Sequence, residues 1–471
     1  MDADVIDEML EGSNQNRFVK DWKYTGKRKA IRKRELKDCP KEEMMKSYSE
    51  MSKEELMQEK QSLEQAYADY QKMDLSLNMA RGKPAPAQLD LANDLLTAIS
   101  ADELVDEISG LDTRNYGGLD GIPEAKELIA SMVDAKADQV IVFGNSSLNT
   151  MYDQVARGML TGYCGETPWC KLPEVKWICP VPGYDRHFAV TEHFGIRMIN
   201  VPMSEDGPDM DMVEELVKDP AVKGMWNVPK YSNPQGYVYS EEVTRRIANL
   251  KPAAKDFRVF WDNAYCVHHL YVEDEKRGHL LNILDLCEKA GNPDLVFEFV
   301  STSKVSYAGG GIAGIVTSEN NKKDILASMT VQTIGYDKVN QLRHARFFDN
   351  GALVEQHMMK HASILRPKFE LVEDKFSKNL AGLGVGSWTK PLGGYFVTYT
   401  TLPGCATRTI QLAKEAGVVM TGAGAPFPYH KDPEDSTIRV SPSYPSLEEL
   451  GQALDVFAVC VKLAAVEKLL A

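Results

Sequence analysis

Short apolar runs alternate with amphipathic stretches between residues 120 and 320, and this alternation predicts the fold. Runs rich in β-branched and aromatic residues predict six buried strands, at Gln139–Phe143, Val175–Cys179, Arg197–Val201, Val222–Val228, Arg258–Trp261 and Leu295–Val300. Helical spacing of apolar positions between most of these runs predicts helices at 124–134, 211–218 and 241–252. Strands that alternate with helices form mostly parallel sheets with helices on both faces. We therefore expect an α/β domain in the centre of the chain.

The segments on either side of this region have a different character. Residues 50–72 predict a helix, and beyond residue 340 the chain is helical to about 380 before an apolar run at 394–400. A helix at 406–416 and a terminal helix from about 446 follow. The pattern predicts a charged N-terminal extension, a segment that joins the small domain, a large domain and a smaller α+β domain, at 1–45, 46–90, 91–344 and 345–471.

The composition is that of a globular protein with an acidic surface. The formal net charge is -14, which repels nucleic-acid phosphates, so we expect no nucleic-acid partner. A basic run at 27–34 is interpreted as a solvated arm. The eight cysteines form no C-x-x-C pair, which favours a reducing, cytoplasmic compartment and no metal site. No apolar run reaches the roughly 18 residues of a membrane span, so no membrane partner is expected.

Polar residues follow four of the predicted strands, at the point where each strand ends. These are Gly144–Ser147, Asn233–Pro234, Asp262 and Ser301–Lys304. Ligands of parallel sheets bind beyond the carboxyl ends of the strands. We therefore expect these four segments to share one crevice.

Three of these side chains are candidate catalytic residues. A crevice can desolvate Lys304, which leaves the sheet in a loop rich in serine and glycine, and so lower its pKa as a Schiff-base lysine requires. Taken alone, this context favours a solvated surface lysine, because most lysines are solvated surface groups. Asp262 is either a cap or turn residue, or a buried carboxylate that pairs with a protonated pyridine nitrogen. Tyr265 would then donate a hydrogen bond to the 3-oxygen of that ring.

Two further loops carry candidate binding groups. Asn233 is an ordinary turn residue, or an amide that donates to the same 3-oxygen or to a substrate carboxylate. Asn145, Ser146 and Ser147 stand between a strand and a predicted helix, where backbone N–H groups and the helix dipole favour a phosphate. The same residue types are also ordinary helix caps.

The order and spacing of these groups strengthen the functional interpretation of each. Asn233, Asp262 and Lys304 are 29 and 42 residues apart, each at the end of its own apolar run. With Gly144–Ser147, Tyr184 and Arg439, they resemble the fold-type-I aminotransferases of the aspartate aminotransferase superfamily, which depend on pyridoxal 5'-phosphate (PLP). The resemblance covers about residues 75 to 460. Longer phrases resemble the divergent bacterial subgroup Ic of this superfamily, at Leu77–Pro84, Gly144–Leu148, Pro182–Phe188, Ser301–Lys304 and Asp337–His344.

This resemblance implies a fold and a role for each residue. The implied fold is a large domain with a mostly parallel seven-stranded sheet and a smaller α+β domain. The implied cofactor-binding residues are Asn145, Ser146, Ser147, Tyr184, whose ring stacks on the pyridine, Asn233, Asp262, Tyr265, Ser301, Ser303 and Lys304. Tyr116 is implied to reach the cofactor of the partner in a homodimer with active sites at the subunit interface. Arg439 and Gly82 are implied to bind the substrate α-carboxylate, with Asn233 beside them.

Two positions leave the family pattern open. Ile312 stands eight residues after Lys304, where most relatives carry an arginine that binds the cofactor phosphate. No motif identifies the arginine that binds the distal carboxylate of a dicarboxylic substrate. Arg186 is the candidate because it lies two residues beyond Tyr184, although it is equally a surface arginine. Arg343 and Arg346 are the next in line.

The sequence thus predicts a PLP-dependent transaminase that works by ping-pong chemistry, with L-aspartate and 2-oxoglutarate as the expected pair. Lys304 is the expected Schiff base and proton carrier. The alternatives are an aminotransferase for other amino acids, a PLP-dependent β-lyase and, more remotely, a PLP-sensing transcription regulator. A regulator needs a DNA-binding module, and residues 1–70 show no clear helix-turn-helix pattern.

Overall fold

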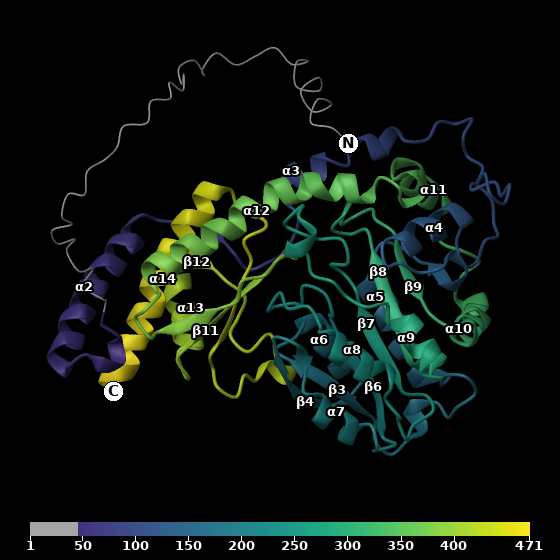
Figure 1. The fold of residues 1–471 in the computed structure, drawn as a ribbon. Helices are drawn as coiled ribbons and strands as arrows, with labels where there is room; N and C mark the ends of the chain where they lie inside the picture. The colour runs from purple at the N-terminus through teal and green to yellow at the C-terminus, as the bar shows by residue number, and fades with distance from the viewer. Residues whose placement is uncertain (1–45) are drawn as a thin grey trace, which may run out of the picture. The chain divides into compact units, whose positions relative to one another are not determined.

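The computed structural model describes residues 46–471, so the predicted extension at 1–45 and its basic run lie outside the described residues. The main sheet has eight strands in the order β2-β9-β8-β7-β6-β3-β4-β5 (Figure 1). Their bounds, in chain order, are β2 (Val140–Val142), β3 (Lys176–Val181), β4 (Arg197–Ser204), β5 (Gly207–Pro208), β6 (Val222–Asn227), β7 (Arg258–Asp262), β8 (Val296–Ser301) and β9 (Ala313–Val316). The strands from β4 to β8 along the sheet pair in parallel, whereas β9 and β5 pair antiparallel with their neighbours.

All six predicted strands are present, and two short strands that were not predicted join them. β5 adds only two residues at the edge, which raises the predicted count from seven strands to eight. β9 follows the glycines at 309–311, and its central Gly314 leaves no room for a side chain, because a Cβ would lie 2.9 Å from Ile129 Cγ2. The glycines of this short segment hide the apolar run that marks the other strands.

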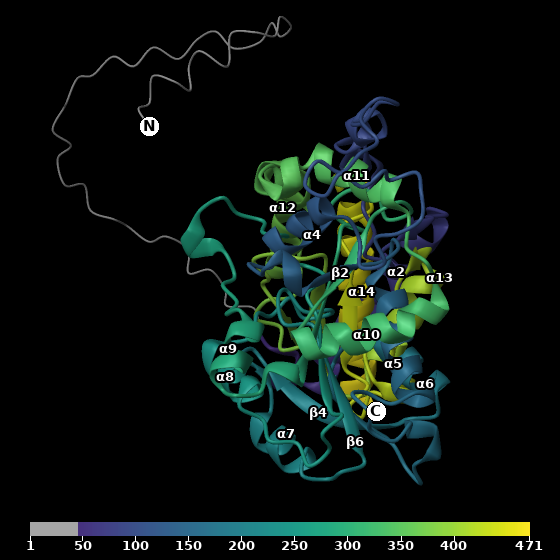
Figure 2. The same ribbon diagram turned by 90° about the vertical axis from the view of Figure 1, so that its right-hand side faces the viewer.

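Helices cover both faces of the main sheet, as Figure 2 shows. One face packs against α4 (Pro123–Ser131), α7 (Met210–Leu216), α8 (Glu241–Ala248) and α9 (Ile283–Lys289). The other face packs against α5 (Ser147–Leu160), α6 (Asp185–His193) and α10 (Glu319–Gln332). The strands other than β4 are buried on both faces, which explains why they are continuous apolar runs rather than alternating ones.

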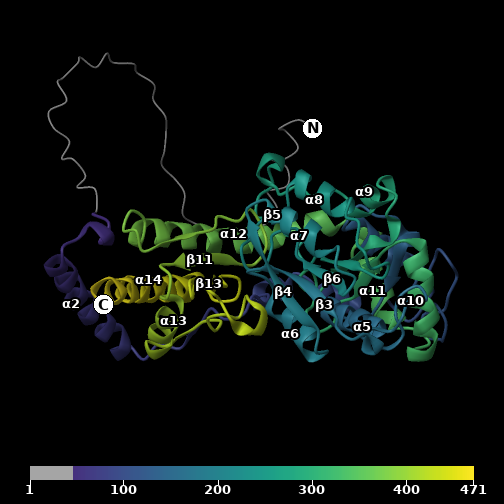
Figure 3. The same ribbon diagram turned by 90° about the horizontal axis from the view of Figure 1, so that it is seen from below.

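A second group of elements packs around its own core, beside the main sheet (Figure 3). Its strands are β1 (Leu77–Asn78), β10 (Gly386–Trp388), β11 (Val397–Thr401), β12 (Val418–Val419) and β13 (Thr437–Val440). Its helices are α2 (Lys53–Lys72), α13 (Ala406–Glu415) and α14 (Leu447–Leu470), with α3 (Pro86–Asp90), α11 (Lys338–Phe347) and α12 (Val354–Asn379) along the chain between the two groups.

Local signals set the ends of the longest helices of this group. α2 and α14 each begin with a capping box, formed by Ser52 with Glu55 and by Ser446 with Glu449. The two helices then pack against each other. The domain boundaries at 90 and 344 stay a prediction. None of the helices within residues 46–471 is both long and apolar enough to cross a bilayer.

Candidate active site

A cavity of about 570 Å³ lies where β6, β7 and β8 end, and it reaches Arg439 of β13. All but two of the predicted site residues line it. The residues that line it are Gly82, Ser146, Ser147, Tyr184, Arg186, Asn233, Asp262, Tyr265, Ser301, Ser303, Lys304 and Arg439. The carboxyl ends of the parallel strands therefore bring the four polar segments together, as expected.

Lys304 lies in the loop after β8, with its amine over an aromatic ring. Its Nζ is 4.6 Å from the centroid of the Tyr265 ring. Two hydrogen bonds hold the loop: the Thr302 N–H donates to the Ile312 carbonyl (2.9 Å), and the Ile312 N–H donates to Thr302 Oγ1 (3.0 Å). Gly311 fits beside them only because it lacks a Cβ, which would lie 2.8 Å from Thr302 Oγ1. The loop thus directs Lys304 toward the cavity.

Asp262, the last residue of β7, is a buried carboxylate with one partner. His187 Nε2 lies 2.9 Å from its Oδ2, and the His187 ring stacks on Trp226 at 4.5 Å between centroids. Its Oδ1 is buried and has no hydrogen-bond partner among residues 46–471. A buried carboxylate oxygen is costly to leave unpaired, so this position calls for a cationic or donating group from a ligand.

Two tyrosines, Tyr265 and Tyr184, lie near Lys304, and burial raises the pKa of both hydroxyls. Burial raises the pKa of the Tyr265 hydroxyl, and the negative charge of Asp262 adds to the rise. Burial raises the pKa of Tyr184 to about 12, against the opposing effect of the Lys304 charge. Both hydroxyls are therefore hydrogen-bond donors at neutral pH, as the predicted role of Tyr265 requires.

Arg439 is 7% exposed and makes three hydrogen bonds through its guanidinium. NH1 donates to Asp185 Oδ1 (2.9 Å) and to Asn233 Oδ1 (3.1 Å), and NH2 donates to Thr421 Oγ1 (3.2 Å). Its Nε has no partner in the described part of the chain. The edge formed by Nε and NH2 therefore has donor capacity left for a carboxylate. Phe396 supports the group from its face, 5.0 Å from the ring centroid.

Gly82 lies close to the same aromatic ring. A Cβ at this position would lie 2.3 Å from Phe396 Cζ, so no other residue fits without displacing Phe396. The backbone at Gly82 can thus line the cavity beside the Arg439 guanidinium, as the family resemblance implies.

The amino end of α5 opens onto the cavity and is suited to a phosphate. Ser146 is the N-cap of this 14-residue helix, and its hydroxyl makes no capping hydrogen bond. Free N–H groups and the helix dipole attract an anion to this end. Ser303 lines the cavity too, although its hydroxyl donates to the Asn145 carbonyl (2.9 Å). Ile312 is buried in the core and does not line the cavity, so no cation reaches the site from that position.

The two remaining predicted cofactor residues do not line the cavity. Asn145 is exposed, and its carbonyl holds Ser303 in place. Tyr116 is 78% exposed, and its hydroxyl makes no hydrogen bond among the described residues. An exposed tyrosine outside its own cavity leaves the predicted role across a subunit interface open to test.

The arginines considered for a distal carboxylate differ in their surroundings. Arg186 lines the cavity, is exposed and forms no ion pair within residues 46–471. Neither Arg343 nor Arg346 lines this cavity. Arg343 donates to Asn340 Oδ1 (2.6 Å), and Arg346 pairs with Glu107 (2.6 Å) and with a second carboxylate. Arg186 therefore remains the candidate.

Three groups of the site carry no predicted role. His187 supports Asp262, and Asp185 and Thr421 hold Arg439. His187 stands three residues after Tyr184, which places both on one side of the first turn of α6, and this spacing could have pointed to it. Nothing local marks Thr421, because its contact with Arg439 exists only in the folded chain.

Comparison with known proteins gives a consistent picture. Residues 51–471 match the family model described as "Aspartate amino-transferase". The chain is 46% identical over 408 residues to an aspartate aminotransferase of Corynebacterium glutamicum, covering 86% of this chain and 94% of that one.

Solved structures agree with the fold. A crystal structure of an aspartate transaminase from Corynebacterium glutamicum has a TM-score of 0.87 at 45% identity, over 90% of this chain and 99% of that one. An α-aminoadipate aminotransferase from Thermus thermophilus, complexed with N-(5'-phosphopyridoxyl)-L-leucine, shares the fold at a TM-score of 0.65 and 19% identity, over 84% of this chain and 93% of that one. The predicted fold class and the predicted resemblance are confirmed.

Proposed function

The chain belongs to the aspartate aminotransferase family and is an aminotransferase, and from this premise we propose that it transfers the amino group of L-aspartate to 2-oxoglutarate with PLP as cofactor. The observation that carries the proposal is one cavity that holds Lys304, the unpaired Oδ1 of Asp262 and the guanidinium of Arg439. Each meets a different chemical group of cofactor or substrate.

The residues of the cavity fit PLP at three points. Lys304 supplies an amine for covalent attachment. The unpaired, buried Oδ1 of Asp262 suits a protonated pyridine nitrogen. Ser146, Ser147 and the amino end of α5 suit a phosphate dianion. When bound, PLP withdraws electrons from the α-carbon of an amino acid and so makes its C–H bond acidic.

The chain's own groups then divide the work. Once released, the Lys304 amine can take a proton from the substrate α-carbon and carry it, because it is a flexible base at the centre of the cavity. His187 holds Asp262 in position, so that its free oxygen would accept a hydrogen bond from the protonated pyridine nitrogen. Tyr265 and Tyr184 remain protonated, so their hydroxyls can donate hydrogen bonds.

Arg439 binds the substrate α-carboxylate in this proposal. NH1 is already held by Asp185 and Asn233, which leaves the Nε–NH2 edge for two parallel hydrogen bonds to a carboxylate. Arg186 reads the distal carboxylate, since it lines the cavity and forms no ion pair among the described residues. A substrate with two carboxylates, such as aspartate or 2-oxoglutarate, satisfies both arginines.

We further propose a homodimer in which Tyr116 reaches the partner's cofactor phosphate, and a cytoplasmic location. The exposure of Tyr116, 78%, supports the first, because a tyrosine side chain seldom stays so exposed. The seven cysteines within residues 46–471 form no disulfide, which supports the second.

An amino-donor screen tests the proposal. The purified enzyme is mixed with PLP, 2-oxoglutarate and each of a set of L-amino acids, and the 2-oxo acid product is measured. We expect the highest kcat/KM with L-aspartate and no turnover by Lys304→Ala. An aromatic or aliphatic donor with a kcat/KM above that of aspartate would contradict the assigned substrate, whereas the family membership would stand.

A further inference from the structure

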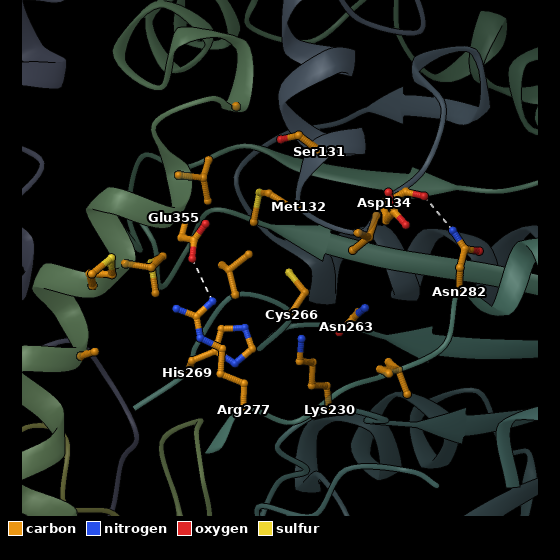
Figure 4. A pocket seen from close by; sticks show the side chains of 18 of the residues that line it. Ser131, Met132, Asp134, Lys230, Asn263, Cys266, His269, Arg277, Asn282 and Glu355 are labelled. Atoms are coloured by element: carbon orange, nitrogen blue, oxygen red, sulfur yellow. Dashed lines mark hydrogen bonds and ion pairs between the residues drawn. The ribbon is translucent and has the colours of Figure 1, made fainter. Parts of the chain in front are cut away.

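A second cavity, of about 470 Å³, lies on the other side of the strand ends that form the active site. Figure 4 shows it between α4, α12 and the loop that follows β7. Its volume is within the roughly 300–1,000 Å³ of small-molecule sites. None of its lining residues lines the active-site cavity.

Residues at the end of β7, in the neighbouring strand β8 and in the loop after β6 supply both cavities. Asp262 lines the active site, and the next residue, Asn263, lines the second cavity. Asn233 and Lys304 face the active site, whereas Lys230, in the same loop as Asn233, lines the second cavity. Asp262 and Asn263 are successive residues, which point to opposite sides in an extended segment, so the end of β7 serves both sites.

Three polar groups at the second cavity have charge or hydrogen-bond capacity that other side chains of residues 46–471 leave unused. Lys230 makes no ion pair and no side-chain hydrogen bond within residues 46–471, although its pKa is lowered by burial. Glu298 of β8 is 3% exposed and accepts one hydrogen bond, from Asn263 Nδ2 (2.8 Å). Asn263 Oδ1 is buried without any partner in the described part of the chain. Burial raises the pKa of Glu298 to about 7, against the lowering effect of the Asn263 hydrogen bond.

Two other polar groups of the cavity, Arg277 and His269, are already paired. Arg277 NH1 donates to Glu355 Oε1 (2.8 Å), drawn as a dashed line in Figure 4. His269 Nδ1 lies 2.6 Å from the Tyr231 hydroxyl. A ligand of this cavity would therefore pair best if it placed an anionic group at Lys230 and a cationic hydrogen-bond donor at Glu298 and Asn263.

Apolar side chains form the rest of the wall. They come mainly from the end of α4, the loop after β7 and the start of α12, and include Met132, Val267, Leu280, Val354, Met358 and Met359. Methionine side chains adapt to different apolar shapes. This wall offers no group that would bind a second carboxylate.

We propose that this cavity is a binding site for a free α-amino acid with an apolar side chain, separate from the active site. The ligand carboxylate pairs with Lys230, and its ammonium group donates to Glu298 and to Asn263 Oδ1. The apolar side chain lies against the methionines of α4 and α12. A zwitterion meets all three unpaired groups at once, whereas a simple anion or a simple amine meets only part of them.

Isothermal titration calorimetry tests the proposal with L-valine, L-leucine, L-methionine and L-phenylalanine. The full-length enzyme is compared with Lys230→Met and Glu298→Gln, which remove a charge with little change in shape. The key control is Arg439→Ala, which removes the guanidinium that is proposed to bind the substrate carboxylate in the active site. Thermal unfolding and transamination of aspartate by Lys230→Met verify that this variant is folded.

We expect at least one of these amino acids to bind both wild type and Arg439→Ala, and to bind Lys230→Met and Glu298→Gln at least about tenfold more weakly. 4-Methylpentanoate lacks the ammonium group of leucine, and 3-methylbutylamine lacks its carboxylate. Each should bind the wild-type enzyme no more tightly than leucine binds Lys230→Met or Glu298→Gln. The absence of binding by all four amino acids would overturn the proposal. So would binding that is lost in Arg439→Ala but kept in Lys230→Met, since that pattern places the amino acid in the active site.

Discussion

The replacement Asp262→Asn separates the charge of this residue from its shape. Asp262 is 3% exposed, and its Oδ2 lies 2.9 Å from His187 Nε2 while its Oδ1 has no partner within residues 46–471. An asparagine can keep an oxygen toward His187, which turns its amide nitrogen to the position of Oδ1. A hydrogen-bond donor then faces the pyridine nitrogen, so the side chain no longer stabilises the protonated form of the ring.

The size of the effect follows from the burial. Removing one partner of a buried charge pair costs about 3–5 kcal/mol, because solvent cannot replace the lost interaction. At about 1.36 kcal/mol per factor of ten, kcat/KM for aspartate should fall by roughly two to four orders of magnitude. The unfolding temperature should change little, because asparagine has nearly the same size and keeps the contact with His187.

The assay measures aspartate transamination by wild type and Asp262→Asn with PLP, and again with an analogue methylated on the ring nitrogen. The methylated ring is permanently cationic and needs no carboxylate to stay so. We expect the analogue to narrow the gap between the two enzymes. Turnover of Asp262→Asn within a factor of about three of wild type with PLP would refute the assigned role.

Four further predictions test other parts of the site and the chain. Lys304→Ala should lose the visible absorbance of bound cofactor and several orders of magnitude of turnover, and borohydride reduction with peptide mapping should label only Lys304. Mixing the inactive variants Tyr116→Phe and Lys304→Ala should restore partial activity, and failure to do so under conditions that exchange subunits would exclude a shared site. Arg186→Ala should lose activity with aspartate and glutamate by roughly thirty- to several-thousand-fold but spare alanine, whereas Arg439→Ala should lose all three; an equal loss for aspartate and alanine would exclude Arg186. Burial raises the pKa of Glu298 from 4.5 to about 7, so its contribution to stability is present below pH 4.5 and is lost as the pH rises through 7. Glu298→Gln should therefore reduce the loss of stability with rising pH, so its unfolding temperature at pH 8 should be higher than that of wild type. An unchanged dependence of the unfolding temperature on pH would argue against a buried carboxyl group without a cationic partner.

Much of the fold could be predicted because its signals are local. A buried parallel strand is a continuous apolar run, so six strands can be predicted from the sequence. A capping box marks the start of a helix within four residues, as it does for α2 and α14. The candidate residues could also be predicted, because parallel strands end at one edge and the loops after them must share a crevice. Lys304, Asp262 and Asn233 line one cavity for this reason.

The partners of these residues were decided only by the tertiary structure. His187 beside Asp262 and Asp185 beside Arg439 are contacts across 75 and 254 residues, and no local pattern specifies such pairs. β9 escaped prediction because its glycine is required by the packing of Ile129 rather than by its own strand. The second cavity also could not be predicted from the sequence, because Lys230, Asn263 and Glu298 lie on three separate segments of the chain. They become one site because β6, β7 and β8 are neighbours in the sheet, which brings the three segments side by side.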